Sequence, residues 1–174
     1  MKVLAFGASN SSKSINKQLA TYTAGLIPNA KVEVLDLNDF EMPLYSVDRE
    51  QADGVPDLAQ QFLDKIGEAD VLVVSFAEHN GSFTAAYKNL FDWASRLNKK
   101  VYQGKPTILL STSPGKGGAG SVFKAAQGSA PYIGMDVKAA LSVPSFYDNF
   151  DVENGVVSNP EIRAELEAAV AMLQ

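Results

Sequence analysis

The first twenty residues constrain the fold more than any other stretch of the chain. Residues 2–7 form an apolar run that ends at Gly7, which is typical of a buried parallel strand. The next seven residues, Ala8 to Ser14, include four hydroxyl side chains and one amide. From Ser14 onward apolar residues recur at helical spacing, so the chain is predicted to turn into a helix. A strand therefore delivers a loop of serine and asparagine to a helix N-terminus.

A loop in this position can hold an anion. Backbone N–H groups and the positive end of the helix dipole point at it, and the hydroxyls supply further donors. The alternative is an ordinary polar turn in which Ser14 only caps the helix. We favour an anion site because the hydroxyls are so dense directly behind the first strand.

Composition sets limits on the class of protein. A chain of 174 residues fits one domain, residues 1–174, that can bury about 70% of its unfolded surface. The net charge of −5 argues against a nucleic-acid partner, and the lack of cysteine excludes thiol catalysis, thiolate metal sites and disulfides. No apolar run approaches the ~18 residues of a membrane span, and no signal-peptide pattern is present. We therefore expect a soluble, cytoplasmic protein with no membrane partner.

The rest of the chain alternates between strand and helix patterns. Four further strands are predicted at residues 31–36, 71–76, 107–112 and 137–143. Four further helices are predicted, one opening at residue 56 and the others covering residues 83–97, 121–127 and 160–173. Residues 37–55 are predicted to be a long loop, and residues 150–157 a small hairpin around Asn154 and Gly155.

Five strands alternating with five helices predict an α/β fold with a doubly wound, five-stranded parallel sheet and helices on both faces. Right-handed crossovers and the chain length favour the flavodoxin-like strand order 2-1-3-4-5. In that order a ligand binds at the carboxyl ends of strands 1 and 3, where the winding reverses. The polar turns behind the first, third and fourth strands are therefore expected to converge on one edge of the sheet.

Each of these three turns suits a different part of one ligand. The first offers a phosphate cradle, and the second offers Glu78, His79 and the amides of Asn80 and Gly81 for a polar heterocycle edge. The third, residues 115–120, is nearly free of side chains and lets a flat ligand approach closely. Together they describe a mononucleotide with a large ring, for which FMN is the simplest candidate.

Other motifs fit the sequence less well. Gly115-x-Gly117-x-x-Gly120 matches a dinucleotide fingerprint, but it follows the fourth strand and its acid, Asp136, precedes a strand. Lys116 lacks the hydroxyl neighbour of a Walker motif. A single histidine in the chain excludes a metal site built from several histidines, and nothing in the spacing recommends a catalytic triad.

The motifs resemble those of the NAD(P)H-dependent FMN reductases, a flavodoxin-like family that includes chromate, quinone and azo-dye reductases. The first loop of that family, Gly-Ser-x-Arg-x-x-Ser-x-Asn-x-x-Leu-Ala, corresponds to ASNSSKSINKQLA at residues 8–20. The flavin-edge motif Thr-Pro-Glu-Tyr-Asn-x-Ser and its Lys-Asn-x-x-Asp-Trp helix correspond to FAEHNGS at 76–82 and KNLFDW at 88–93. The glycine turn corresponds to STSPGKGG at 111–118, with MPLY at 42–45 similar to the family's Leu-Pro-Leu-Tyr loop.

The resemblance implies a cofactor and a set of residues that bind it. It implies FMN as cofactor, NAD(P)H as co-substrate, and a homodimer or homotetramer with the flavin near the subunit interface. The implied phosphate loop holds Ser9, Ser11, Ser14, Ile15 and Asn16. The implied flavin ring lies against Phe76, Ala77, Glu78, His79, Asn80, Gly81, Ser113, Gly115, Lys116, Gly117 and Gly118. The motif arginine is replaced by Ser11, and the motif Pro and Tyr by Ala77 and His79.

We therefore expect an FMN-dependent oxidoreductase that passes electrons from NAD(P)H through flavin to a small acceptor. A quinone, an azo compound or a metal oxyanion would suit that role. Because the cofactor carries the redox chemistry, we assign no catalytic residue and no metal ligand. Two alternatives stay open: a flavodoxin-type electron carrier, and a family member that has lost flavin and serves as a nucleotide-binding or interaction domain.

Overall fold

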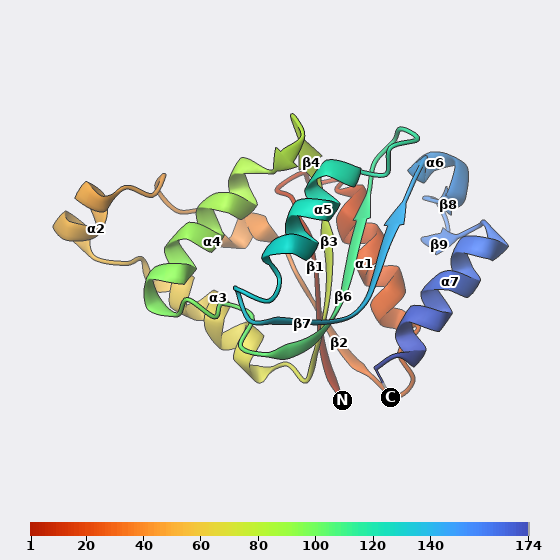
Figure 1. Ribbon diagram of the computed structural model, residues 1–174, viewed down its shortest axis with the longest axis horizontal. Coiled ribbons are helices and arrows are strands. Elements are labelled where there is room, and N and C mark those ends of the chain that lie inside the picture. The colour runs from red at the N-terminus through yellow and green to blue at the C-terminus, as the bar shows by residue number, and fades with distance from the viewer. Residues whose placement is uncertain (174) are drawn as a thin grey trace.

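A five-stranded parallel sheet forms the centre of the computed structural model, which describes residues 1–173 (Figure 1). Its strands are β1 (Lys2–Ala8), β2 (Lys31–Leu35), β3 (Val71–Phe76), β6 (Lys105–Thr112) and β7 (Met135–Val143). Their order is β2-β1-β3-β6-β7, and each neighbouring pair is parallel. This order confirms the predicted flavodoxin-like winding, which reverses between β1 and β3.

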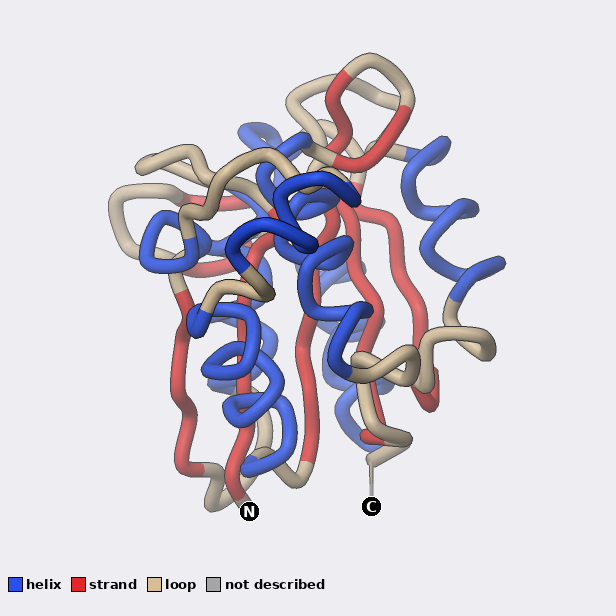
Figure 2. The backbone as a smooth tube through the Cα atoms, turned by 90° about the vertical axis from the view of Figure 1, so that its left-hand side faces the viewer, coloured by secondary structure: helices blue, strands red, loops and turns tan. Residues whose placement is uncertain are grey.

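Helices cover both faces of the sheet (Figures 1 and 2). The helices α3 (Asp57–Glu68), α4 (Ala85–Leu97) and α5 (Gly120–Ser129) pack on one face, and α1 (Ile15–Gly25) and α7 (Pro160–Ala171) on the other. Side chains alternate along a strand, so Leu4 and Phe6 enter the first core while Val3 and Ala5 enter the second. All of β3 is buried, as its unbroken apolar run predicts for a strand covered on both sides. Within residues 1–173, no helix has the length and apolar character needed to cross a membrane.

The segment predicted as a long loop contains two short helices, so that prediction was wrong in part. A 3-10 helix, η1 (Leu37–Phe40), is capped by Asp36, and α2 (Val47–Asp53) is capped by Ser46. The carboxylate of Asp36 accepts from the N–H of Asn38, and the hydroxyl of Ser46 accepts from the N–H of Arg49. Helices of four and seven residues are too short to show a helical period in the sequence.

Two hairpins accompany the main sheet. The predicted hairpin near Asn154 is confirmed as β8 (Phe150–Asp151) and β9 (Val156–Val157). A second one, β4 (Glu78–His79) with β5 (Ser82–Phe83), was predicted only as a polar turn. Its tip residues Asn80 and Gly81 both have positive φ, 52° and 75°, as a tight hairpin turn requires. Because Phe83 belongs to this hairpin, α4 begins at Ala85 and not at residue 83 as predicted.

Helix α1 crosses the end of β1 at a distance that only glycine permits. A Cβ built on Gly7 would overlap the backbone nitrogen of Lys17 and lie 2.8 Å from its Cα. Protein interiors are close-packed, so neither backbone can move aside freely. The glycine that ends the first apolar run is therefore what lets α1 begin tightly against the edge of the sheet.

Replacing Gly7 by Ala should destabilise the protein by about 2 kcal/mol or more, because the added methyl group overpacks a backbone contact. The matched control is Gly128→Ala, at an exposed position inside α5 where an added Cβ meets nothing within 4 Å. That change should stabilise the protein by about 0.5–1 kcal/mol through helix propensity. Urea unfolding measures both, and equal stability of the Gly7→Ala and wild-type proteins would contradict the close contact.

Candidate functional site

Three turns at the carboxyl edge of the sheet line one cleft of about 340 Å³. The turns follow strands β1, β3 and β6, so the predicted convergence of three polar turns on one edge of the sheet is confirmed. The helix α6 (Phe146–Asn149) adds a fourth wall. The lining residues are Ser9, Ser11, Lys13, Ser14, Ile15, Asn16, Ala77, Glu78, His79, Thr112, Ser113, Pro114 and Tyr147.

The first turn presents backbone donors at the start of α1. Its own hydroxyls satisfy some N–H groups: Ser9 accepts from Ser11 at 3.1 Å and Ser14 accepts from Lys17 at 3.1 Å. Ser14 is therefore the N-cap of α1, as the simpler interpretation of this loop predicted. Among residues 1–173, however, the N–H groups of Ser12, Ile15 and Asn16 have no acceptor. Free N–H groups at a helix N-terminus suit an anion.

The side chain of Asn16 points into the protein and joins three elements. Its Nδ2 donates to the carbonyl of Thr112 at 3.1 Å. Its Oδ1 accepts from the N–H of Thr112 at 3.1 Å and from the hydroxyl of Ser75 at 2.7 Å. Asn16 is 3% exposed, so these bonds lie in a buried setting where they tie α1 to the ends of β3 and β6. Because the side chain is used in these bonds, only the backbone N–H of Asn16 remains to bind an anion, as the sequence analysis expects of this residue.

Glu78 connects the second turn to the helix behind the third. Its Oε2 accepts from the N–H of Val122 at 2.8 Å, in the first turn of α5. The N-cap of α5 is Ala119, with a positive φ of 60° and no side-chain cap, so Glu78 takes over that function from another element. The sequence prediction gave Glu78 a ligand role only, because a cap supplied from a distant turn leaves no local signal.

Gly118 anchors the third turn to the ends of two neighbouring strands. Its φ is positive at 57°, and its carbonyl accepts from the hydroxyls of Ser111 and Ser142, each at 2.7 Å. A Cβ on Gly118 would overlap the Ser142 hydroxyl. By contrast, a Cβ added to Gly115 or Gly117 would meet nothing within 4 Å, so open space surrounds the exposed part of this turn.

Several predicted site residues do not line the cleft. Phe76 is 1% exposed and packs edge-on against Phe83 and Tyr87, so its side chain belongs to the core. Asn80 and Gly81 occupy the exposed tip of the β4–β5 hairpin. The others, all in the third turn, are Gly115, Lys116, Gly117 and Gly118. Their contact with a ligand stays a prediction.

Four lining residues were absent from the predicted set: Lys13, Thr112, Pro114 and Tyr147. Lys13 could have been found, since it is a cation inside a hydroxyl-rich loop. Tyr147 could not, because its position depends on long-range bonds: the N–H groups of Ser145 and Phe146 donate to carbonyls of the third turn.

The two lysines near the first turn, Lys13 and Lys17, differ in whether their charge is paired. The Lys17 ammonium bonds to the Asp36 carboxylate at 2.7 Å, and that hydrogen bond lowers the pKa of Asp36 from its usual value. Lys17 is therefore drawn toward the end of β2. Lys13 lines the cleft and makes no ion pair within residues 1–173, so it is the cation available to an anion there.

Comparison with known proteins adds independent information. A family model described as NADPH-dependent FMN reductase matches residues 1–147. A 2-hydroxy-1,4-benzoquinone reductase of Burkholderia sp is 32% identical over 154 residues, which are 87% of this chain and 80% of that protein.

Two solved structures share the fold. The flavoenzyme NAD(P)H:(acceptor) oxidoreductase of Paracoccus denitrificans has a TM-score of 0.75 and 24% identity, covering 99% of this chain and 94% of that one. An FMN-dependent NADH-azoreductase from Bacillus anthracis, solved in complex with FMN, has a TM-score of 0.66 and 15% identity, with 99% of both chains covered.

Replacing Asn16 by Ala should destabilise the protein by about 3 kcal/mol or more, because each buried polar group left without a partner costs roughly 1–3 kcal/mol. The groups affected are the N–H and carbonyl of Thr112 and the hydroxyl of Ser75. Asn10→Ala, at an exposed position in the same turn, is the control and should change stability by less than about 0.5 kcal/mol. Similar losses in both variants, measured by urea unfolding, would show that the Asn16 bonds do not hold this edge together.

Proposed function

The chain belongs to the NADPH-dependent FMN reductase family, and from that membership we propose that it is an FMN-dependent oxidoreductase. It passes electrons from NAD(P)H through the flavin to a small acceptor such as a quinone, an azo compound or a metal oxyanion. The observation that carries this proposal is the convergence of the three turns on one cleft. The names of the relatives, a benzoquinone reductase and an azoreductase, support the choice of acceptor.

The first turn fits the phosphate of FMN. The unpaired N–H groups of Ser12, Ile15 and Asn16 and the positive end of the α1 dipole favour a dianion. The hydroxyls of Ser9 and Ser11 add donors around these N–H groups, and Ser14, though it caps α1, can also donate its own proton. Lys13 supplies a positive charge in place of the family arginine, whose position is taken by Ser11.

The second and third turns fit the ring. The backbone of Ala77, Glu78 and His79 would meet the polar edge of the isoalloxazine, with Asn80 and Gly81 at the tip of the same hairpin. The open space around Gly115 and Gly117 leaves room for a flat group.

When bound, FMN supplies the redox chemistry. The residues of this chain bind the cofactor, orient it and limit which acceptors reach it, so no side chain is assigned as acid, base or nucleophile. We further propose a homodimer or homotetramer with the cofactor near the subunit interface. The segment that carries α2 projects from one side of the molecule (Figure 1), and two apolar side chains on it, Leu44 and Val47, are 72% and 56% exposed. A second copy of the chain could cover them. A cytoplasmic location, expected from the sequence, stays a prediction.

Adding FMN to the purified protein should give saturable binding and steady NAD(P)H oxidation with a quinone. Riboflavin lacks the phosphate and should bind about ten- to a hundredfold more weakly, since a hydrogen bond to a charged group contributes roughly 1.5–3 kcal/mol. Visible absorption of the flavin measures binding, and the loss of NAD(P)H measures turnover.

The alternatives give different results in the same experiment. An electron carrier would bind FMN but would not oxidise NAD(P)H steadily with a quinone. A protein that has lost flavin would stay colourless on addition of FMN. Equal affinity for FMN and riboflavin would show that the phosphate does not lie on the first turn.

A further inference from the structure

A second cleft, of about 580 Å³, opens beside the cofactor cleft. It lies between α1 and the β8–β9 hairpin, which contacts that helix through β9. Lys13 and Ser14 line both clefts, so the two meet at the N-terminus of α1. Small-molecule sites commonly have volumes of about 300–1,000 Å³, so this space is large enough for a nucleoside.

The second cleft runs along one face of α1. Ser14, Gln18 and Tyr22 line it at intervals of four residues, which places them above one another on the helix. The backbone rise from Ser14 to Tyr22 is about 12 Å at 1.5 Å per residue. The cleft therefore begins where a phosphate on the first turn would lie and continues away from the flavin ring.

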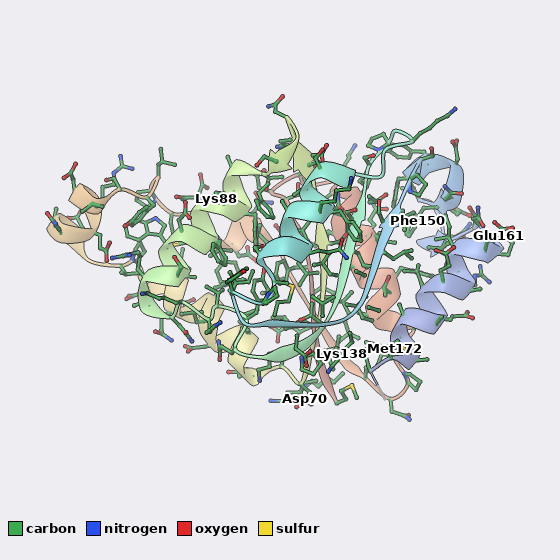
Figure 3. The ribbon with its side chains drawn as sticks, viewed as in Figure 1. Asp70, Lys88, Lys138, Phe150, Glu161 and Met172 are labelled. Atoms are coloured by element: carbon green, nitrogen blue, oxygen red, sulfur yellow. The ribbon has the colours of Figure 1, made fainter. Side chains whose placement is uncertain are left out.

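The far end of this cleft has the chemistry of a purine site. Tyr22 is half-buried, and Phe150, labelled in Figure 3, holds its ring edge-on at a centroid distance of 6.1 Å and an angle of 81°. Leu26 adds an apolar wall. The side-chain amide of Gln18 makes no hydrogen bond within residues 1–173, so its donors and acceptor remain for a base edge. A purine offers a flat face for the aromatic ring and polar edges for the amide.

The near end suits a second phosphate. Lys13 stands where the two clefts join and is exposed there. Lys17 also lines this cleft, but its ammonium is bonded to the Asp36 carboxylate at 2.7 Å. Lys13 is therefore placed to donate to the second phosphate of a pyrophosphate that crosses from one cleft to the other.

We propose that the second cleft is a subsite for the adenosine half of a flavin dinucleotide, so that this chain binds FAD as well as FMN. This inference rests on the proposed function, because it needs the flavin phosphate on the first turn. The second phosphate lies at Lys13 and the adenine lies against Tyr22. The adenosine of NAD(P)H is a poorer occupant, because it would have to pass the flavin phosphate on the first turn before it reached the second cleft.

Titrating FAD and FMN separately into the wild-type protein tests the subsite. We expect FAD to bind at least about fivefold more tightly than FMN, the lower end of what stacking one base on an aromatic side chain contributes. Tyr22→Ala should remove that preference and leave the FMN affinity within twofold, which also shows that the variant is folded. Gln18→Ala, a milder change on the same face, should weaken FAD but not FMN. Tyr132→Ala is the control, because this tyrosine is 78% exposed and lines neither cleft.

Equal affinities of the wild-type protein for FAD and FMN would overturn the inference while leaving the proposed function intact. It would also be overturned if Tyr22→Ala raised the KM for NAD(P)H without changing the flavin preference. Failure of both flavins to bind would instead refute the proposed function.

Discussion

The buried hydrogen bonds of Asn16 are the interaction on which the rest of this site depends. One carboxamide joins the start of α1 to the ends of β3 and β6, and Gly7 lets α1 come close enough to β1 for this to happen. In the protein interior these bonds are electrostatically strong, and losing one partner leaves the others unsatisfied. The N–H groups of Ser12 and Ile15, which have no acceptor within residues 1–173, belong to the turn and helix start that these bonds hold in place.

The other two turns are held in the same way, by polar bonds that reach another element. Glu78 caps α5 across the edge, and the carbonyl of Gly118 accepts from two serine hydroxyls on neighbouring strands. The part of the third turn that faces outward, around Gly115 and Gly117, has open space around it, and the Gly115 carbonyl accepts from the backbone N–H of Ser145. The site therefore combines turns fixed by hydrogen bonds with open space beside them. This combination suits a protein whose cofactor supplies the reactivity and whose own residues hold the cofactor in position.

Much of this architecture could be predicted from the sequence, because long apolar runs and helical periods are local signals. The five strands, their order and the convergence of the turns follow from such signals together with the handedness of crossovers. Tyr147 in the cleft and the cap that Glu78 gives α5 could not be predicted, since each depends on contacts between segments far apart in the chain. Asn16 shows the same limit: the motif indicated that this residue binds a ligand, but it gave no sign that the side chain bonds to Thr112 and Ser75 on two different strands.

The central claim is that a flavin phosphate lies on the unpaired N–H groups at the start of α1. Amide proton and nitrogen chemical shifts, recorded by NMR while FMN is added, test it most directly. The N–H protons of Ser12, Ile15 and Asn16 should move downfield on saturation with FMN, as they gain a charged acceptor, and should stay nearly unchanged with riboflavin. Identical shifts of these three amides with both ligands, or none with FMN, would contradict the account.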